Sequence, residues 1–208
     1  MPEDGRMSDA DARRATSADR DAVIATLTRA FAIDPLVRWF FPDEVTYPAR
    51  ARAFFGYLFD IRIEHGEVQV AGDGDAASLW TPPGGVTMSQ AEQDRRWIDG
   101  VEAGAGPGEL QRIEAYEEAA LAMTPDQPHW YLGVLGTDPA HRGLGLARAV
   151  IRPVLERADR DGLPAFLETA TPENLPFYAG FGFEESAHAD LRDGPTVRAL
   201  WRSAGDSG

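Results

Sequence analysis

The segment that most constrains the fold runs from Trp130 to Asp161. An apolar run, 130–137, is typical of a β-strand and ends in a turn at Asp138-Pro139. Gly143 and Gly145 follow, and a helical apolar pattern continues to Asp161-Gly162. A strand, a glycine loop and a helix in this order point several unpaired backbone N–H groups at one spot, with the helix dipole behind them. The segment therefore predicts a site for a phosphate-bearing ligand.

Two common phosphate loops do not fit these glycines. The dinucleotide motif G-x-G-x-x-G/A fails at its last position, which is Arg148. A P-loop requires a lysine after its glycines, and this chain contains no lysine at all.

The predicted helix, 143–161, carries an apolar stripe along one face. The stripe consists of Leu144, Ala147, Ile151, Val154, Leu155 and Ala158.

A second block strengthens the pattern about twenty residues further along the chain. A strand candidate, 165–169, is followed by Asn174 and then by Phe177-Tyr178-Ala179-Gly180-Phe181. Asn174 and Tyr178 are four residues apart, so on a helix they would share one face. Arg142-x-x-Gly145-x-Ala147, taken with this block, resembles the acyl-CoA loop and closing strand of the GCN5-related N-acetyltransferase (GNAT) superfamily. Three segments, 79–83, 166–169 and 174–178, resemble its puromycin N-acetyltransferase-like branch.

The resemblance implies a fold of the α/β (α+β) class. We expect a mixed, mostly antiparallel sheet that is splayed between strands 130–137 and 165–169. One N-acetyltransferase domain would span residues 1–208, with frayed ends at 1–11 and 203–208. Other elements expected from the sequence are a strand at 13–16, helices through Ala30 and over 47–65, a hairpin of 68–70 with 78–80, and a last hairpin turning at 192–195. A helical insertion, about 86–128, holds candidate helices 89–102 and 109–123 and would cover the active site, pad the sheet or form a dimer contact.

The resemblance also implies that acetyl-CoA is the co-substrate. Backbone groups of Gly143, Leu144, Gly145, Leu146 and Ala147 would bind its pyrophosphate, and the strand end, Leu135, Gly136 and Thr137, would bind its pantetheine arm. Arg142, Arg148 and Arg152 would supply a local basic patch. Gly136 suits either a close backbone approach or a β-bulge.

Tyr178 matches the general acid of the family, which returns a proton to the coenzyme sulfur. A phenol has a pKa near 10, so it is protonated at neutral pH; packing beside Phe177 and Phe181 is the alternative role. Asn174 would contact the pantetheine arm or cap a helix. Glu168 follows the apolar run Ala165-Phe166-Leu167. It would be the general base if burial raised its pKa, with a structural hydrogen bond as the alternative.

Composition excludes several other chemistries and partners. The 208 residues contain no cysteine, which excludes disulfides and thiolate catalysis, and the four histidines lack metal-ligand spacing, so no metal is expected. His129 and His141 remain alternative bases. The formal net charge of −14 disfavours nucleic acid and anionic membranes as partners. No segment resembles a signal or a membrane span, which favours a cytoplasmic protein.

The sequence leaves the acceptor open. A small-molecule amine is the first interpretation, whether antibiotic-like or a metabolite. Acetylation of a protein or peptide amine and a non-catalytic acyl-CoA-binding module are the alternatives. Acceptor residues are expected in segments 34–60 and 82–128, where Trp39, Phe40, Phe41 and Tyr57 would form an aromatic wall or pack in the core. The oligomeric state is also open, with a homodimer among the alternatives.

Overall fold

A computed structural model of the chain describes residues 12–205. Seven strands form one sheet in the order β1-β2-β3-β4-β5-β7-β6. The strands are β1 (Arg13–Arg14), β2 (Glu67–Ala71), β3 (Ala76–Thr81), β4 (Trp130–Thr137), β5 (Ala165–Thr169), β6 (Glu184–Asp190) and β7 (Thr196–Arg202). Neighbouring strands are antiparallel except β4 and β5, which are parallel. The expected mixed, mostly antiparallel sheet is confirmed, and its parallel pair is β4 and β5.

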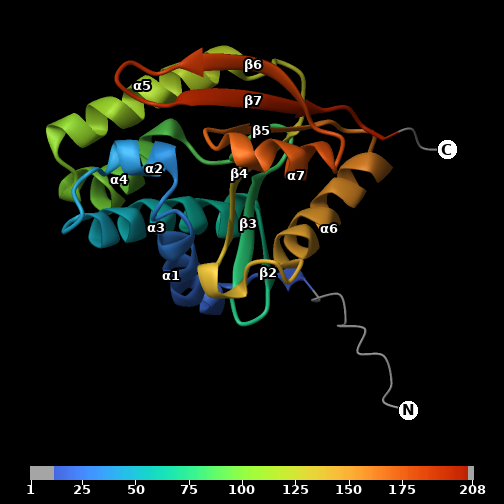
Figure 1. The fold of residues 1–208 in the computed structure, drawn as a ribbon, viewed down its shortest axis with the longest axis horizontal. Helices are drawn as coiled ribbons and strands as arrows, with labels where there is room; N and C mark the ends of the chain where they lie inside the picture. Colours follow the sequence, from blue (N-terminus) through green and yellow to red (C-terminus); the bar gives the residue numbers. More distant parts are fainter. Residues whose placement is uncertain (1–11, 206–208) are drawn as a thin grey trace.

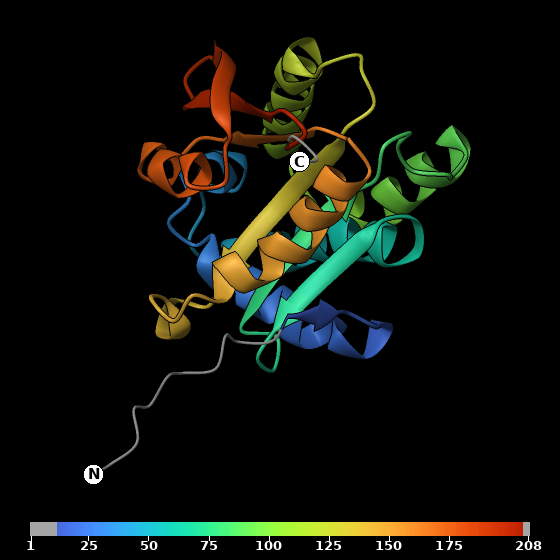
Figure 2. The same ribbon diagram turned by 90° about the vertical axis from the view of Figure 1, so that its right-hand side faces the viewer.

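Helices cover both faces of the sheet (Figures 1 and 2). On one face, α1 (Arg20–Ala30) and α3 (Tyr47–His65) pack on β2, β3 and β4; on the other face, α6 (Leu146–Arg160) lies across the same strands. Two large apolar clusters and two smaller ones result among the described residues. One large cluster joins Val23, Leu27 and Phe59 to the strands, and the second joins Ile151 and Val154 to Trp80 and Leu132. The short helix α7 (Leu175–Ala179) belongs to the second cluster through Tyr178.

The segment between β3 and β4 is helical, as the sequence predicted. It forms α4 (Gln90–Gly100) and α5 (Pro107–Met123), with a short 3-10 turn, η2 (Glu102–Gly104), between them. Ser89 caps α4 by accepting from the N–H of Glu92 at 3.3 Å. Helix α5 packs against α2 (Pro35–Phe40) and against the β6–β7 hairpin (Figure 1). The insertion therefore contacts the acceptor-side segment 34–60 as well as the sheet.

Helix α2 is absent from the sequence prediction, although its signal is local. Asp34 accepts hydrogen bonds from the backbone N–H groups of Leu36 and Val37, each at 3.0 Å. Pro35 occupies the first helical position, where its missing N–H costs nothing. The sequence prediction assigns the aromatic residues 39–41 to a cavity wall or the core, and it does not include the helix start at Asp34-Pro35.

Helix α6 also begins later than predicted, at Leu146 instead of Gly143. Gly143 and Gly145 both adopt φ of 80°, a conformation that helical residues do not take, so the glycines form the loop and the helix starts after them. The predicted stripe was consequently wrong at its first turn. Leu144 is 45% exposed, whereas Leu146 and Val150 are buried along with Ile151 and the residues after it.

Hydrogen bonds hold the described residues that lie next to the two chain ends. Gly205 donates its backbone N–H to Asp159 Oδ1 at 2.9 Å, so the last described residues are tied to α6. At the other end, the Asp19 carboxylate accepts from the backbone N–H of Thr16 at 2.8 Å and holds the turn before α1. The expectations for residues 1–11 and 206–208 lie outside the described residues.

Candidate active site

Strands β4 and β5 separate partway along their length. They pair only from Trp130 to Leu132 on β4 and from Ala165 to Leu167 on β5. A register shift in the neighbouring β3–β4 ladder places Leu79 opposite Val134 but Trp80 opposite Leu132, which leaves Gly133 as an extra residue on β4. Such a β-bulge bends and twists its strand. It opens the sheet next to Glu168, the first residue beyond the last β4–β5 pair.

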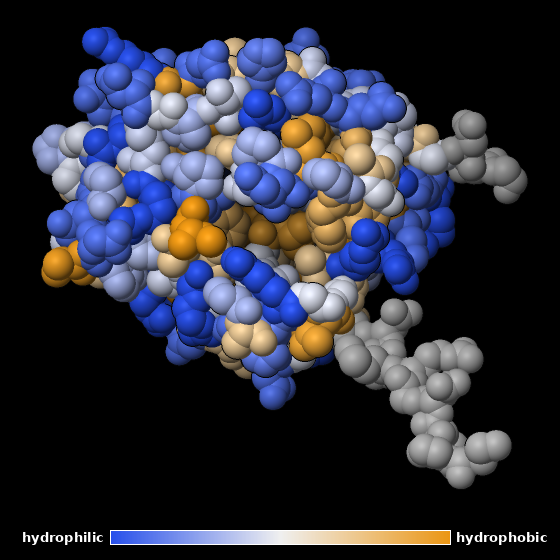
Figure 3. Space-filling model, viewed as in Figure 1, coloured by the Kyte–Doolittle hydropathy of each residue, from blue (hydrophilic) through white to orange (hydrophobic). Residues whose placement is uncertain are grey.

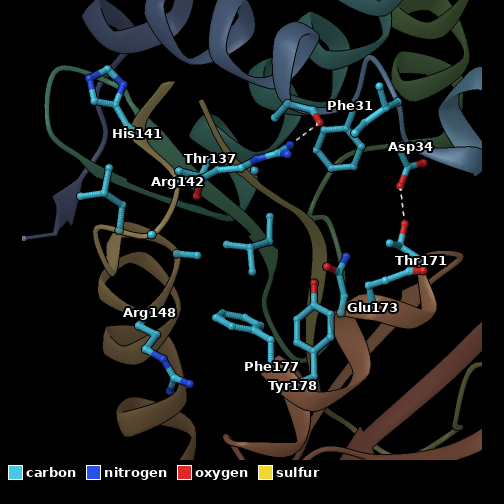
Figure 4. A pocket seen from close by; sticks show the side chains of 18 of the residues that line it. Phe31, Asp34, Thr137, His141, Arg142, Arg148, Thr171, Glu173, Phe177 and Tyr178 are labelled. Atoms are coloured by element: carbon cyan, nitrogen blue, oxygen red, sulfur yellow. Dashed lines mark hydrogen bonds between the residues drawn. The ribbon is translucent and has the colours of Figure 1, made fainter. Parts of the chain in front are cut away.

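A cavity of about 800 Å³ lies on one side of this opening. The end of β4, the glycine loop with the start of α6, the turn η4 (Pro172–Asn174) with α7, and the link between α1 and α2 all contribute to it. Figure 3 shows the hollow on this face with an apolar floor, and Figure 4 shows the side chains around it. Predicted cofactor residues that line it are Leu135, Gly136, Thr137, Arg142, Gly143, Gly145, Leu146, Ala147, Asn174 and Tyr178.

The glycine loop presents backbone N–H groups to this cavity. Gly145 precedes α6 in the left-handed conformation and provides no side-chain cap. Within residues 12–205, no hydrogen bond from the N–H groups of 143–147 to another backbone group occurs outside the helix. The loop is fixed from behind, because Asp138 accepts from the N–H of Ala140 at 2.9 Å and forms an ion pair with Arg29 at 2.5 Å. Unpaired N–H groups at a helix start suit a pyrophosphate.

Thr137 supplies a second sign that a polar ligand fits here. Its hydroxyl is buried in the cavity wall and has no hydrogen-bond partner among the described residues. A buried hydroxyl without a partner costs free energy, which a ligand acceptor would recover. The residues present therefore fit a coenzyme that enters with its phosphates at the loop and its arm along the end of β4.

The predicted basic patch is divided. Arg142 and Arg148 line the cavity. Arg142 donates to the carbonyl of Ala30 at 3.3 Å, and the Arg148 guanidinium lies 5.5 Å and 5.2 Å from the ring centres of Phe177 and Phe181. Arg152 and the exposed Leu144 are not among the residues that line the cavity.

Gly136 makes a close approach, but to a helix. A Cβ atom at this position would lie 2.6 Å from Leu27 Cδ2 and 3.2 Å from the Phe31 ring, so the glycine lets α1 press against β4. The bulge that the sequence also allowed at Gly136 lies instead at Gly133.

Tyr178 is buried in α7, and its ring points into the cavity (Figure 4). Burial raises the pKa of Tyr178 well above its ordinary value, so the hydroxyl remains a proton donor at neutral pH. The rings of Phe177 and Phe183 hold it in place, with centres 5.3 Å and 6.0 Å away. Asn174 precedes α7, makes no capping hydrogen bond with its side chain, and lines the cavity.

A second cavity, of about 380 Å³, lies on the other side of the opening. It shares Phe31, Asp34, Leu135, Asn174 and Tyr178 with the first cavity, so the two meet at these residues. Its far wall comes from the insertion, chiefly from α5. The insertion residues are Trp97, Ile113, Tyr116, Glu117, Ala120, Leu121 and Thr124. The insertion thus borders this second cavity.

Glu168 lines the second cavity. Burial raises the pKa of Glu168 from an ordinary value of 4.5 to about 7, while a hydrogen bond from the Tyr131 side chain and the positive charge of Arg62 limit the increase. A carboxyl group with this pKa exchanges a proton near neutral pH, as a general base must. Its neighbours in sequence, Thr169 and Ala170, line the same cavity.

The other proposed side chains are distributed between the cavities and the core. Phe40 and Tyr57 line the second cavity, whereas Phe41 is 1% exposed and belongs to the core, and Trp39 lies on a different surface groove. His141 lines the first cavity. His129 packs edge-on against Phe166 and Trp201.

Sequence reasoning missed Arg62 and Tyr131 of the second cavity, and it did not single out Tyr116 within the expected acceptor segment 82–128. Arg62 lies in the last turn of α3, where a basic residue is common for other reasons. The two tyrosines sit in elements that were predicted for their apolar residues. The pattern Tyr131-Leu132-Gly133, a glycine within a strand, was the available signal of a bulge.

The fold and site define an acyl-CoA-dependent acyltransferase of mixed α and β structure. The model of the Acetyltransferase (GNAT) family matches residues 82–183. An uncharacterized N-acetyltransferase of Schizosaccharomyces pombe is 28% identical over 181 residues, which cover 83% of this chain and 73% of the relative. This chain has the GNAT fold and is an N-acetyltransferase of the GNAT type that uses acetyl-CoA.

Solved structures agree on the fold. A Corynebacterium glutamicum protein described as histone acetyltransferase HPA2 and related acetyltransferase is 25% identical, with a TM-score of 0.66 over 95% of this chain and 98% of that one. Arylalkylamine N-acetyltransferase 2 of Aedes aegypti superposes with a TM-score of 0.68 at 15% identity, over 93% of this chain and 98% of that one.

Among residues 12–205, no helix combines the length and the apolar character needed to cross a bilayer. In the same part of the chain, histidine and acidic side chains nowhere gather in a group of three or more that could hold a metal ion.

Proposed function

We propose that this enzyme transfers the acetyl group of acetyl-CoA directly to a primary amine of a small molecule. The observation that carries the proposal is the junction of two cavities at Tyr178, with Glu168 lining the smaller one. The larger cavity holds the coenzyme. The smaller cavity holds the amine, because it lies beyond the β4–β5 opening and is walled by aromatic side chains.

Glu168 acts as the general base in this proposal. Its carboxylate removes a proton from the ammonium form of the acceptor, directly or through a water molecule, and the free amine nitrogen attacks the thioester carbonyl carbon. The new C–N bond forms as the C–S bond breaks. Tyr178 donates its phenolic proton to the departing thiolate sulfur, and the second amine proton restores the phenol through solvent.

Backbone N–H groups and bound geometry supply the remaining catalysis. The N–H groups of 143–147 hold the pyrophosphate, and the end of β4, Leu135 to Thr137, aligns the arm so that the thioester reaches the junction. Alignment of two reactants in one site replaces a bimolecular encounter by a reaction within a complex, which lowers the barrier by several kcal/mol.

Two features support a small acceptor over a protein segment. Helix α5 walls the amine cavity, and a cavity of about 380 Å³ is of the size that small ligands occupy. Resemblance of segments 79–83 and 174–178 to the puromycin N-acetyltransferase-like branch supports an antibiotic-like or metabolite amine. Aedes aegypti arylalkylamine N-acetyltransferase 2 is a structural relative with an amine in its name, whereas ribosomal-protein-S18-alanine N-acetyltransferase of Escherichia coli, at 13% identity, acts on a protein.

A thiol-release assay tests the proposal. Purified enzyme with acetyl-CoA is supplied with a panel of small primary amines and, separately, with basic peptides. Tyr178→Phe and Glu168→Gln should each lower kcat on the best amine by about a hundredfold or more and leave acetyl-CoA binding within about threefold. Preference for the peptides would favour the protein-acetylating alternative. Tight acetyl-CoA binding without turnover of any amine would favour a non-catalytic module.

A further inference from the structure

Arg62 is a buried charge that the proposed chemistry does not use. Its side chain leaves the last turn of α3 and lines the amine cavity, and only 8% of the residue is exposed. Its one hydrogen bond within the described residues is a long one, from Nη1 to the carbonyl of Leu58 at 3.4 Å. Its Nε has no partner there, and none of the ion pairs found among residues 12–205 includes Arg62. A buried guanidinium with most of its donors unused is costly unless a ligand satisfies them.

The bulge on β4 creates the space for this guanidinium. A Cβ atom at Gly133 would lie 2.5 Å from Arg62 Nη2 and 3.1 Å from its Cζ, so a larger residue would push the guanidinium away from its place against the strand. Burial lowers the pKa of the Arg62 guanidinium. Tyr131, Tyr116 and Glu168 oppose this change, because they favour the charged form. The β-bulge at Gly133 therefore opens the sheet and also makes room for the Arg62 guanidinium in the cavity.

The cavity consequently offers two complementary groups. Glu168 presents a carboxylate and Arg62 presents a planar fork of N–H donors, yet the two do not form a direct ion pair. Apolar and aromatic side chains make up much of the remaining wall, including Phe40, Phe54, Leu58 and Trp97. A guanidinium fork matches the two oxygens of a carboxylate better than any neutral group.

We propose that the acceptor is an amino acid or a close analogue, whose carboxylate binds Arg62 while its amino group faces Glu168 and the thioester. An apolar or aromatic side chain would fill the remaining space. This inference rests on the proposed function and narrows its substrate class. A plain arylalkylamine would leave the guanidinium without a partner.

Matched acceptors test the inference with the full chain. One series is L-phenylalanine, L-phenylalaninamide and 2-phenylethylamine, and the other is L-leucine, L-leucinamide and 3-methylbutylamine. Members of a series share their side chain and differ only at the carboxyl position. Initial rates of thiol release with acetyl-CoA, and mass spectrometry of the N-acetyl product, should give the amino acid of at least one series a kcat/KM about tenfold or more above its amide and amine.

Three variants assign that preference to Arg62. Arg62→Gln should reduce the ratio of kcat/KM for the acid to that for the amine by about ten- to a hundredfold. Gly133→Ala should reduce the same ratio, because the added methyl group displaces the guanidinium while every charge is kept. Arg52→Gln, an exposed position on the same helix, is the control and should keep the ratio of the unmodified enzyme.

The outcomes separate the inference from the proposed function. If the best acceptors in the amine panel lack a carboxylate, or if the acid-to-amine ratio is near one in the unmodified enzyme, the inference is wrong while the amine acetyltransferase stands. A preference that survives both Arg62→Gln and Gly133→Ala also overturns it. If no amine releases coenzyme A, the proposed function itself fails. Should Arg62→Gln not fold, Gly133→Ala and the unmodified enzyme still decide the question.

Discussion

The hydroxyl of Thr171 donates a hydrogen bond to Asp34 Oδ2 over 3.1 Å and joins two loops that are 137 residues apart in the sequence (Figure 4). Asp34 ends the link from α1 to α2, and Thr171 lies in the link from β5 to α7. Both residues line the coenzyme cavity, and Asp34 also lines the amine cavity. The bond therefore closes one wall of the junction.

Thr171→Val should loosen this wall without changing its shape. We expect the KM for acetyl-CoA to rise several-fold and the free energy of unfolding to fall by about 1 kcal/mol, the usual net value of one hydrogen bond. Thr196→Val provides a matched control, because Thr196 donates to Asp190 in the exposed β6–β7 hairpin, far along the chain from both cavities. Steady-state kinetics and urea denaturation measure both quantities. Equal kinetics in the two variants would show that the link does not shape the site.

The rate should depend on pH through Glu168. The base must be deprotonated to accept the ammonium proton, and the pKa of Glu168 is about 7, so kcat/KM should rise as the pH increases through that value. Tyr131→Phe removes the hydrogen bond that lowers this pKa, and the rising limb should shift to higher pH. Ionisation of the acceptor amine adds a second rising limb to the pH profile of kcat/KM. The profiles of the unmodified enzyme and of Tyr131→Phe are therefore each compared with the profile of Glu168→Gln. A limb near pH 7 that persists in Glu168→Gln would remove Glu168 from the role of base.

The same carboxyl group should make stability depend on pH. Its pKa is raised in the folded state, so the native protein holds this proton more tightly than the unfolded chain. The stabilising contribution is complete below about pH 4.5 and is lost as the pH rises through about 7. Its size is about 3 kcal/mol, by the conversion of a pKa shift into free energy. Glu168→Gln should gain stability relative to the unmodified protein between pH 5 and pH 8. Thermal unfolding at both values measures the difference, and a constant difference would contradict the prediction.

Much of the fold was predictable because local signals bounded its elements. Strands β4 and β5 begin and end where their apolar runs meet turn residues, and α3 ends at Gly66 as predicted. The start of α6 was not predictable from its apolar spacing, because residues 143–145 are compatible with either a helix or a glycine loop. Only the left-handed conformation of both glycines decides between them.

The coenzyme side of the site could be predicted better than the acceptor side. Backbone groups of one continuous loop and one strand end form the former, so the motif around Arg142 and Gly145 contains most of the information. The amine cavity is assembled from α2, α3, α4, α5, β4 and β5, which are distant in sequence. The burial of Arg62 depends on the bulge at Gly133, and the pairing of β3 with β4 sets that bulge. A glycine within a strand is a local signal of a bulge, but no local pattern shows that Arg62 occupies the space beside it.

Two alanines should separate the cavities in a functional assay. Ala147, in the first turn of α6, lines the larger cavity, and Ala120, in α5, lines the smaller one. A phenylalanine at either position fills part of its own cavity. Ala147→Phe should raise the KM for acetyl-CoA by about tenfold or more with little effect on the KM of the amine, and Ala120→Phe should do the reverse.

Ala122→Phe controls for the added ring, since Ala122 is exposed on α5 and lines neither cavity. Calorimetric binding of acetyl-CoA checks the assignment without turnover: Ala120→Phe should bind it like the unmodified protein, and Ala147→Phe should not. If Ala120→Phe weakened coenzyme binding as much as Ala147→Phe, the two cavities would be one coenzyme site. Of the two cavities, only the smaller one is lined by α5. If the smaller cavity bound the coenzyme, the insertion would therefore cover acetyl-CoA instead of selecting the acceptor.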